Sequence, residues 1–106
     1  MEDLPTYAKK RVSIIIEAPF LNRLLDLLDR LEVPGYSAMP ILAGRGQDGS
    51  WRRDALSSDA GRMISVVVVI DESKVSDLLR EIKRVLDRQM GIVTVGDVQV
   101  LRPEHF

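Results

Sequence analysis

The fold is decided by the stretch Met63–Ile70, which has the sequence MISVVVVI. Its run of β-branched residues is typical of a strand. Apolar residues occupy successive positions, so both faces of this strand should be covered, as in the middle of a sheet. The segments on either side should supply the neighbouring strands and the covering helices.

The residues after this strand predict a helix and another strand. Apolar side chains recur at helical spacing over Val75–Leu86, and either Asp71 or Ser73 can cap the start of that helix. Strand residues follow at Ile92–Val95 and at Val98–Leu101, with Gly96-Asp97 as a bulge or turn between them.

Two strands are predicted before the central one. The first is Val12–Glu17, with the sequence VSIIIE, and the basic run Lys9–Arg11 should precede it as a solvated edge. The second is Tyr36–Leu42, where Pro40 indicates an edge strand because proline cannot donate to a ladder.

A helix should join these two strands. Pro19 suits its first turn, and apolar residues follow at helical spacing as far as Leu31. The helix should end near Glu32, because Pro34 disfavours helical geometry at the residue before it.

The segment Ala43–Arg62 has no sustained helical or strand period and is rich in glycine and arginine. Trp51 is its only aromatic residue. Long loops in compact domains are usually functional or disordered. We therefore expect a functional loop between the second and third strands.

The resulting order of strand, helix, strand, long loop, strand, helix, strand predicts an α+β, ferredoxin-like fold in a single domain over residues 1–106. Right-handed crossovers place both helices on one face of an antiparallel sheet. The other face, with Ile15 and alternate valines of Val66–Val69, would be exposed in a monomer. Such an apolar face indicates association.

Composition excludes several classes of function. The 15 basic and 16 acidic residues give a net charge of −1, which argues against a broad nucleic-acid surface. Cysteine is absent and His105 is the single histidine, so we expect no metal site, no prosthetic group and no enzymatic activity. Met1–Lys10 lacks an apolar signal core and Val66–Ile70 is too short to span a bilayer, which predicts a cytoplasmic protein without membrane insertion.

Three short motifs are candidates for ligand binding. Gly44-Arg45-Gly46 could help to clamp an anion, or it could be a flexible loop, since no Gly-Lys-Ser/Thr follows as in a P-loop. At Gly35-Tyr36-Ser37, glycine either lets a ligand approach the backbone or caps the preceding helix. Gly91-Ile92-Val93 follows the second helix as Gly35-Tyr36-Ser37 follows the first. The two motifs are thus pseudo-equivalent in this fold, and they can meet only at a sheet edge or across subunits. Arg102, at the end of the last strand, is a further cation that could contact phosphate or could be a solvated terminal charge.

This arrangement, with the Gly-Tyr-Ser and Gly-Ile-Val motifs and the long loop between them, resembles the PII and PII-like signalling family over nearly the whole chain. The resemblance implies a homotrimer whose sheets pack inward around a three-fold axis. It also implies that the long loop is the T-loop, which contacts partner proteins, and that adenine nucleotide binds between subunits at its base.

The resemblance further assigns roles to the motifs. Gly35–Ser37 would lie against base and ribose, Gly91–Val93 would hold the adenine through backbone groups, Arg102 would approach the phosphates, and Gly44–Gly46 would grip phosphate or a small anion. The candidate ligand residues are thus Gly35, Tyr36, Ser37, Gly44, Arg45, Gly46, Gly91, Ile92, Val93 and Arg102. Trp51, Arg52 and Arg53 would face a protein partner.

Two departures from the nitrogen-regulatory pattern narrow these expectations. Ala43–Arg62 lacks the tyrosine that accepts a nucleotidyl group, and Arg88–Gly91 matches the phosphate-binding set poorly. ADP or AMP is therefore expected at least as much as ATP. The chain is more similar to divergent PII-like groups associated with bicarbonate, carboxysomes or membrane transporters, which suggests bicarbonate as a second ligand and such a protein as partner.

Two alternatives stay open from the residues. A small ferredoxin-like monooxygenase or isomerase would need a pocket His, Tyr or paired acids. A trimeric metal-tolerance protein without nucleotide would use soft ligands, for which the candidates are Met39, Met63, Met90 and His105.

Overall fold

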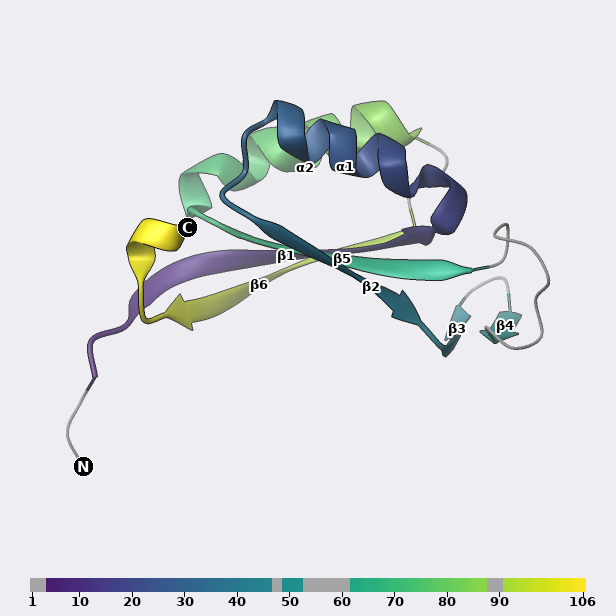
Figure 1. Ribbon diagram of the computed structural model, residues 1–106, viewed down its shortest axis with the longest axis horizontal. Helices are drawn as coiled ribbons and strands as arrows, with labels where there is room; N and C mark the ends of the chain where they lie inside the picture. Colours follow the sequence, from purple (N-terminus) through teal and green to yellow (C-terminus); the bar gives the residue numbers. More distant parts are fainter. Residues whose placement is uncertain (1–3, 47–48, 53–61, 88–90) are drawn as a thin grey trace.

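The computed structural model describes residues 4–46, 49–52, 62–87 and 91–106, with backbone alone at 49–52. It contains a four-stranded antiparallel sheet in the order β2-β5-β1-β6. The strands are β1 (Tyr7–Glu17), β2 (Tyr36–Ile41), β5 (Met63–Ile70) and β6 (Ile92–Val100). The helices α1 (Leu21–Arg30) and α2 (Val75–Leu86) both lie on one face of the sheet, which confirms the predicted fold class (Figure 1).

Short elements complete the described part of the chain. Within it, three 3-10 turns are η1 (Ala18–Phe20), η4 (Glu72–Lys74) and η6 (Pro103–His105). A small hairpin pairs β3 (Ala43–Gly46) with β4 (Gly49–Arg52). This hairpin lies at one end of the molecule, and the start of β1 and the C-terminal residues lie at the opposite end (Figure 1). We call them the loop end and the tail end.

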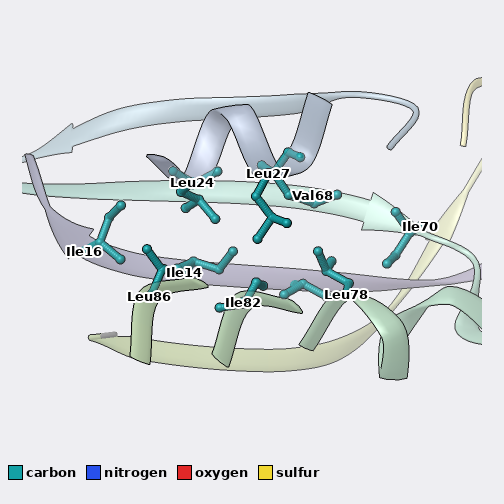
Figure 2. Close-up of a cluster of buried hydrophobic side chains, with 12 residues drawn as sticks. Ile14, Ile16, Leu24, Leu27, Val68, Ile70, Leu78, Ile82 and Leu86 are labelled. Atoms are coloured by element: carbon teal, nitrogen blue, oxygen red, sulfur yellow. The ribbon is translucent and has the colours of Figure 1, made fainter. Parts of the chain in front are cut away.

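The core forms between the helices and one face of the sheet. Val12, Ile14 and Ile16 alternate along β1 and are all 0% exposed, as a period of two requires for a half-covered strand. They meet apolar residues of the helices and of β5 (Figure 2). The fully buried set is Val12, Ile14, Ile16, Leu24, Leu27, Leu28, Val66, Val68, Ile70, Leu78, Ile82 and Leu86. Each such side chain contributes about 1.5–3 kcal/mol by leaving water.

No helix of the described residues lies over the opposite face of the sheet (Figure 1). Ile15, Val67 and Val69 lie on this open face and remain partly exposed. The predicted positions within the sheet are confirmed: β5 is internal, and β2, which contains Pro40, is an edge strand.

Two strand predictions were wrong. β6 runs without a bulge or turn, because Gly96 pairs with Arg11 and Asp97 with Lys10 in unbroken register. β1 begins at Tyr7, so the basic run is part of the strand rather than a solvated edge. Cross-strand pairing to β6 extends β1 beyond the apolar stretch that local pattern alone could detect.

The segment after β2 was predicted to lack strands, yet it contains the β3–β4 hairpin. Glycines obscured this short ladder, because they carry no side chain from which a strand period can be recognised. Arg62 then closes the segment: its carbonyl accepts a hydrogen bond of 2.8 Å from the Ala18 N–H.

The first helix ends near Glu32 as predicted, but the caps of the two helices differ from expectation. Glu32, with φ of 55°, follows α1 in the left-handed conformation; its N–H bonds to the Asp29 carbonyl, and that of Val33 bonds to the Leu28 carbonyl. This is a Schellman motif with glutamate in the position that glycine favours. The interpretation of Gly35 as the capping glycine was therefore wrong. Asp71 precedes η4 but makes no side-chain cap, because its carboxylate binds Lys9 instead.

Candidate functional site

The two pseudo-equivalent motifs lie on opposite edges of the sheet. Tyr36 and Ser37 begin β2, whereas Ile92 and Val93 begin β6. These edge strands are three strand spacings apart, which is about 14 Å. One chain therefore does not bring the two motifs into a common pocket.

The remaining candidates are separated along the strands. Gly44, Arg45 and Gly46 belong to β3 at the loop end, beyond the last residue of β2. Arg102 follows β6 at the tail end, where Val100 pairs with Tyr7. The length of β6 alone puts roughly 30 Å between Ile92 and Arg102. A site that uses all these residues needs the loop end of one copy and the tail end of another.

Tyr36 is oriented away from the open face. Its phenol donates a hydrogen bond of 3.0 Å to Asp29 Oδ1 on α1. This hydrogen bond is the main reason why the pKa of Tyr36 is raised above its ordinary value. Ser37 has the opposite orientation, because it pairs with Val67 and shares the open face with it. Of this motif, Ser37 is the residue whose side chain faces the open sheet.

An open-face row connects the two edges. Met39 pairs with Ser65, Ser65 with Ile15, and Ile15 with Ile92, so the row crosses all four strands. The outer members, Met39 and Ile92, are 49% and 54% exposed. Sequence analysis did not select Met39, Ser65 or Ile15 as a group. Alternation within each strand suggested their face, but their alignment depends on register, which local sequence does not specify.

Gly91 is required by a close backbone approach. A Cβ at this position would lie 2.0 Å from the carbonyl oxygen of Ile15. Gly35, in contrast, has open space where its Cβ would be. Val93 packs against the core, so its side chain is committed to the fold, and its backbone is the part left for ligand contact.

Two surface grooves lie away from the candidate ligand residues. The larger, of about 450 Å³, is at the tail end and is lined by Ala8, Lys9, Lys10, Glu72, Asp97, Val98 and Gln99. The smaller, of about 200 Å³, lies between the end of α1 and the start of α2 and is lined by Leu31, Val33, Ile70, Lys74, Asp77 and Leu78. Neither lining includes a residue predicted to bind nucleotide.

Ion pairs hold three of the four charged side chains that line the larger groove. Lys9 Nζ lies 2.5 Å from Asp71 Oδ1, and Lys10 pairs with Asp97. The hydrogen bond from Lys9 lowers the pKa of Asp71, and the hydrogen bond to Asp97 raises the pKa of Lys10. These lysines stabilise the junction of β1 with its neighbours.

Two of the three predicted partner-binding residues lie at the loop end. Trp51 and Arg52 belong to β4, for which only the backbone is described, and Arg53 lies outside the described residues. Met90, named in the metal-tolerance alternative, also lies outside them. Within the described ranges, no group of three or more His, Cys, Asp or Glu residues could hold a metal ion. No helix in that part of the chain is long and apolar enough to cross a membrane.

Comparisons with known proteins identify relatives of this arrangement. The family model for nitrogen regulatory protein P-II matches residues 9–105. A solved structure of CPII from Thiomonas intermedia K12, a nitrogen regulatory PII-like protein bound to ADP, AMP and bicarbonate, gives a TM-score of 0.86 at 30% identity and covers 98% of each chain. The comparison with curated proteins gives no significant match.

Two further solved structures agree. CPII bound to ADP and bicarbonate gives a TM-score of 0.82 at 33% identity, over 98% of this chain and 99% of that chain. A PII-like signalling protein from Thermus thermophilus gives a TM-score of 0.79 at 23% identity and covers 97% of this chain and 99% of that chain. At this identity, the likeness supports the fold alone.

These relatives decide between the interpretations left open by the sequence. P-II proteins are signalling proteins rather than enzymes, which confirms the expectation of a non-enzymatic protein. They are also generally trimeric and interact with partners. The match over residues 9–105, supported by the fold, shows that this chain belongs to the P-II nitrogen regulatory protein family.

Proposed function

We propose that this protein is a cytoplasmic signal-transduction protein that binds adenine nucleotide in the clefts between the subunits of a homotrimer. The observation that carries the proposal is its 30% identity, over 98% of both chains, to a CPII structure bound to ADP, AMP and bicarbonate. ADP or AMP is the preferred nucleotide and bicarbonate a second ligand.

The placement of the candidate residues supports a site between subunits. Gly35–Ser37 and Gly91–Val93 are on opposite edges of one sheet, and Arg102 is at the end remote from Gly44–Gly46. A ring of copies brings the loop end of one subunit next to the tail end of the next. Each cleft then receives backbone groups from one copy and arginine from another, which suits a purine with phosphates.

The segment Ala43–Arg62 is the output of the proposed sensor. Its two ends are fixed, by β3 pairing with β4 and by the hydrogen bond from Ala18 to Arg62. A nucleotide at its root favours one conformation only through a difference in affinity between conformations. That conformation presents Trp51 and Arg52 to a protein partner, which we place among membrane transporters or carboxysome-related proteins.

The test is a calorimetric titration of the purified protein with ADP, AMP, ATP and GTP, each with and without bicarbonate, alongside light scattering. We expect a trimer that binds adenine nucleotides and discriminates against GTP. Arg102→Ala should weaken ADP binding about tenfold or more, because a charge-assisted hydrogen bond to phosphate is lost. Arg80→Ala is the matched control, because Arg80 pairs with Asp77 on an exposed turn of α2.

A second readout is the fluorescence of Trp51, the single tryptophan. It should change on addition of the nucleotide that binds best. Absence of heat and of fluorescence change with every adenine nucleotide would contradict the proposed function.

A further inference from the structure

The open face of the sheet carries opposite charges at the two ends of β1. Arg11 and Glu17 alternate with the buried Val12, Ile14 and Ile16, so both belong to the open face, and both are exposed. Six residue steps separate them, which is roughly 20 Å in a strand.

The other open-face positions of the described sheet are almost all uncharged. On the neighbouring strands they are Ser37, Met39, Ile41, Met63, Ser65, Val67, Val69, Ile92, Thr94, Gly96, Val98 and Val100. Lys9 is the exception and is already paired with Asp71. Among the described residues, neither Arg11 nor Glu17 forms an ion pair within its own chain.

Covering this face would leave both charges without partners unless the covering surface supplies opposite ones. An unpaired charge removed from water is far more costly than an uncharged neighbour. A second copy of the same face supplies both partners at once, because its β1 carries a carboxylate at one end and a guanidinium at the other. In a closed ring, each copy gives its cation to one neighbour and its anion to the other.

We infer that Arg11 of each subunit pairs with Glu17 of the adjoining subunit, so that three such ion pairs close the open faces head to tail. The inference rests on the proposed homotrimer. It adds a specific contact that fixes which ends of neighbouring sheets meet. The same direction of closure places the loop end of one copy beside the tail end of the next, as the candidate ligand residues require.

Cross-linking provides the sharpest test, because the natural chain contains no cysteine. The variant Arg11→Cys/Glu17→Cys is treated with a bismaleimide too short to join two positions roughly 20 Å apart in one strand. A head-to-tail ring gives covalent dimers and trimers and nothing larger. Each single-cysteine variant is the control and should give no dimer above background.

Charge reversal gives an independent test. Arg11→Glu should raise the protein concentration at which half of the trimers dissociate by about tenfold or more, because like charges then face each other at each seam. Glu17→Arg should act similarly, and the double reversal should restore the wild-type concentration within about threefold. Lys83→Glu, on the exposed side of α2, is the matched control. Circular dichroism checks that each variant is folded.

The outcomes separate this inference from the proposed function. A wild-type monomer in light scattering would overturn both. A wild-type trimer that gives no covalent trimer from the double-cysteine variant, or cross-linking equally well from Arg11→Cys alone, overturns the pairing but leaves the sensor. If the Arg11→Glu trimer dissociates at the same concentration as the wild type, the pairing is likewise overturned and the proposed sensor function is unaffected.

Discussion

The two faces of β1 show how differently one strand can be used. On one face, Val12, Ile14 and Ile16 are 0% exposed beneath the helices. On the other, Ser13 and Ile15 are only half-buried, although they alternate with the first set. The covered face is completed by the chain itself, whereas the open face is the surface of the proposed association.

This difference separates folding from function. The helices need only one face of the sheet, and the alternation of side chains specifies which face they cover. Residues of the other face can therefore change with the demands of a ligand or a neighbouring subunit. Three serines and one threonine of the described sheet, Ser13, Ser37, Ser65 and Thr94, lie on that open face, while the buried set is wholly apolar.

The largest expected effect comes from comparing Ile14→Ala with Ile15→Ala. Loss of Ile14 leaves a cavity in the core and should lower the free energy of unfolding by about 2–5 kcal/mol. Ile15→Ala removes the same atoms from the open face, so its cost should appear mainly as weaker association. Urea unfolding at two protein concentrations measures this. Equal losses for both variants at both concentrations would contradict the distinction between the faces.

The next effect concerns the point where β6 enters the sheet. Gly91→Ala would place a Cβ 2.0 Å from the Ile15 carbonyl oxygen, and relief of this overlap should cost about 1–3 kcal/mol. Gly96→Ala is the control, since nothing lies within 4 Å of its Cβ position. Thermal unfolding of both variants should separate them clearly. Similar melting temperatures would show that the Ile15 backbone moves freely.

Much of the covered face could be predicted from the sequence alone. Met63–Ile70 was predicted as a strand with the bounds that the structure has, and the helices cover the expected face. The patterns behind these predictions are local: runs of β-branched residues and apolar spacing of three and four. The uninterrupted Ile92–Val100 strand was missed, because Gly96 looks like a break until its pairing with Arg11 is known.

The candidate site was less accessible to sequence reasoning. The Gly35–Ser37 and Gly91–Val93 motifs could be found as short patterns, but the orientation of Tyr36 toward Asp29 depends on the register of β2 with β5. The row that includes Ile15 and Ser65 depends on two registers at once. Relations between strands are tertiary, so they are absent from any local pattern.

A smaller effect is expected at the end of the covering layer. Glu32 adopts φ of 55° in the Schellman motif that ends α1, a conformation that costs a side-chain-bearing residue about 1–2 kcal/mol. Glu32→Gly should therefore raise the free energy of unfolding by about 0.4–1 kcal/mol, after allowing for the greater freedom of glycine in the unfolded chain. Glu32→Ala retains the strain and is the control. A lower urea midpoint for the glycine variant than for the alanine variant would contradict this account.

The smallest effect concerns the hydrogen bond between the edge strand and the covering layer. The Tyr36 phenol donates to Asp29 Oδ1, and this bond is the main cause of the raised pKa of Tyr36. A raised pKa in the folded state means that the bond stabilises folding below the unfolded pKa of about 10 and that this contribution is lost as pH rises through the folded value. Asp29→Asn should lower the pKa of Tyr36 toward its ordinary value. Tyrosinate absorbance, measured in a Tyr7→Phe background, follows this single titration, and an unchanged curve would mean that the edge of β2 is held to α1 by apolar contact alone.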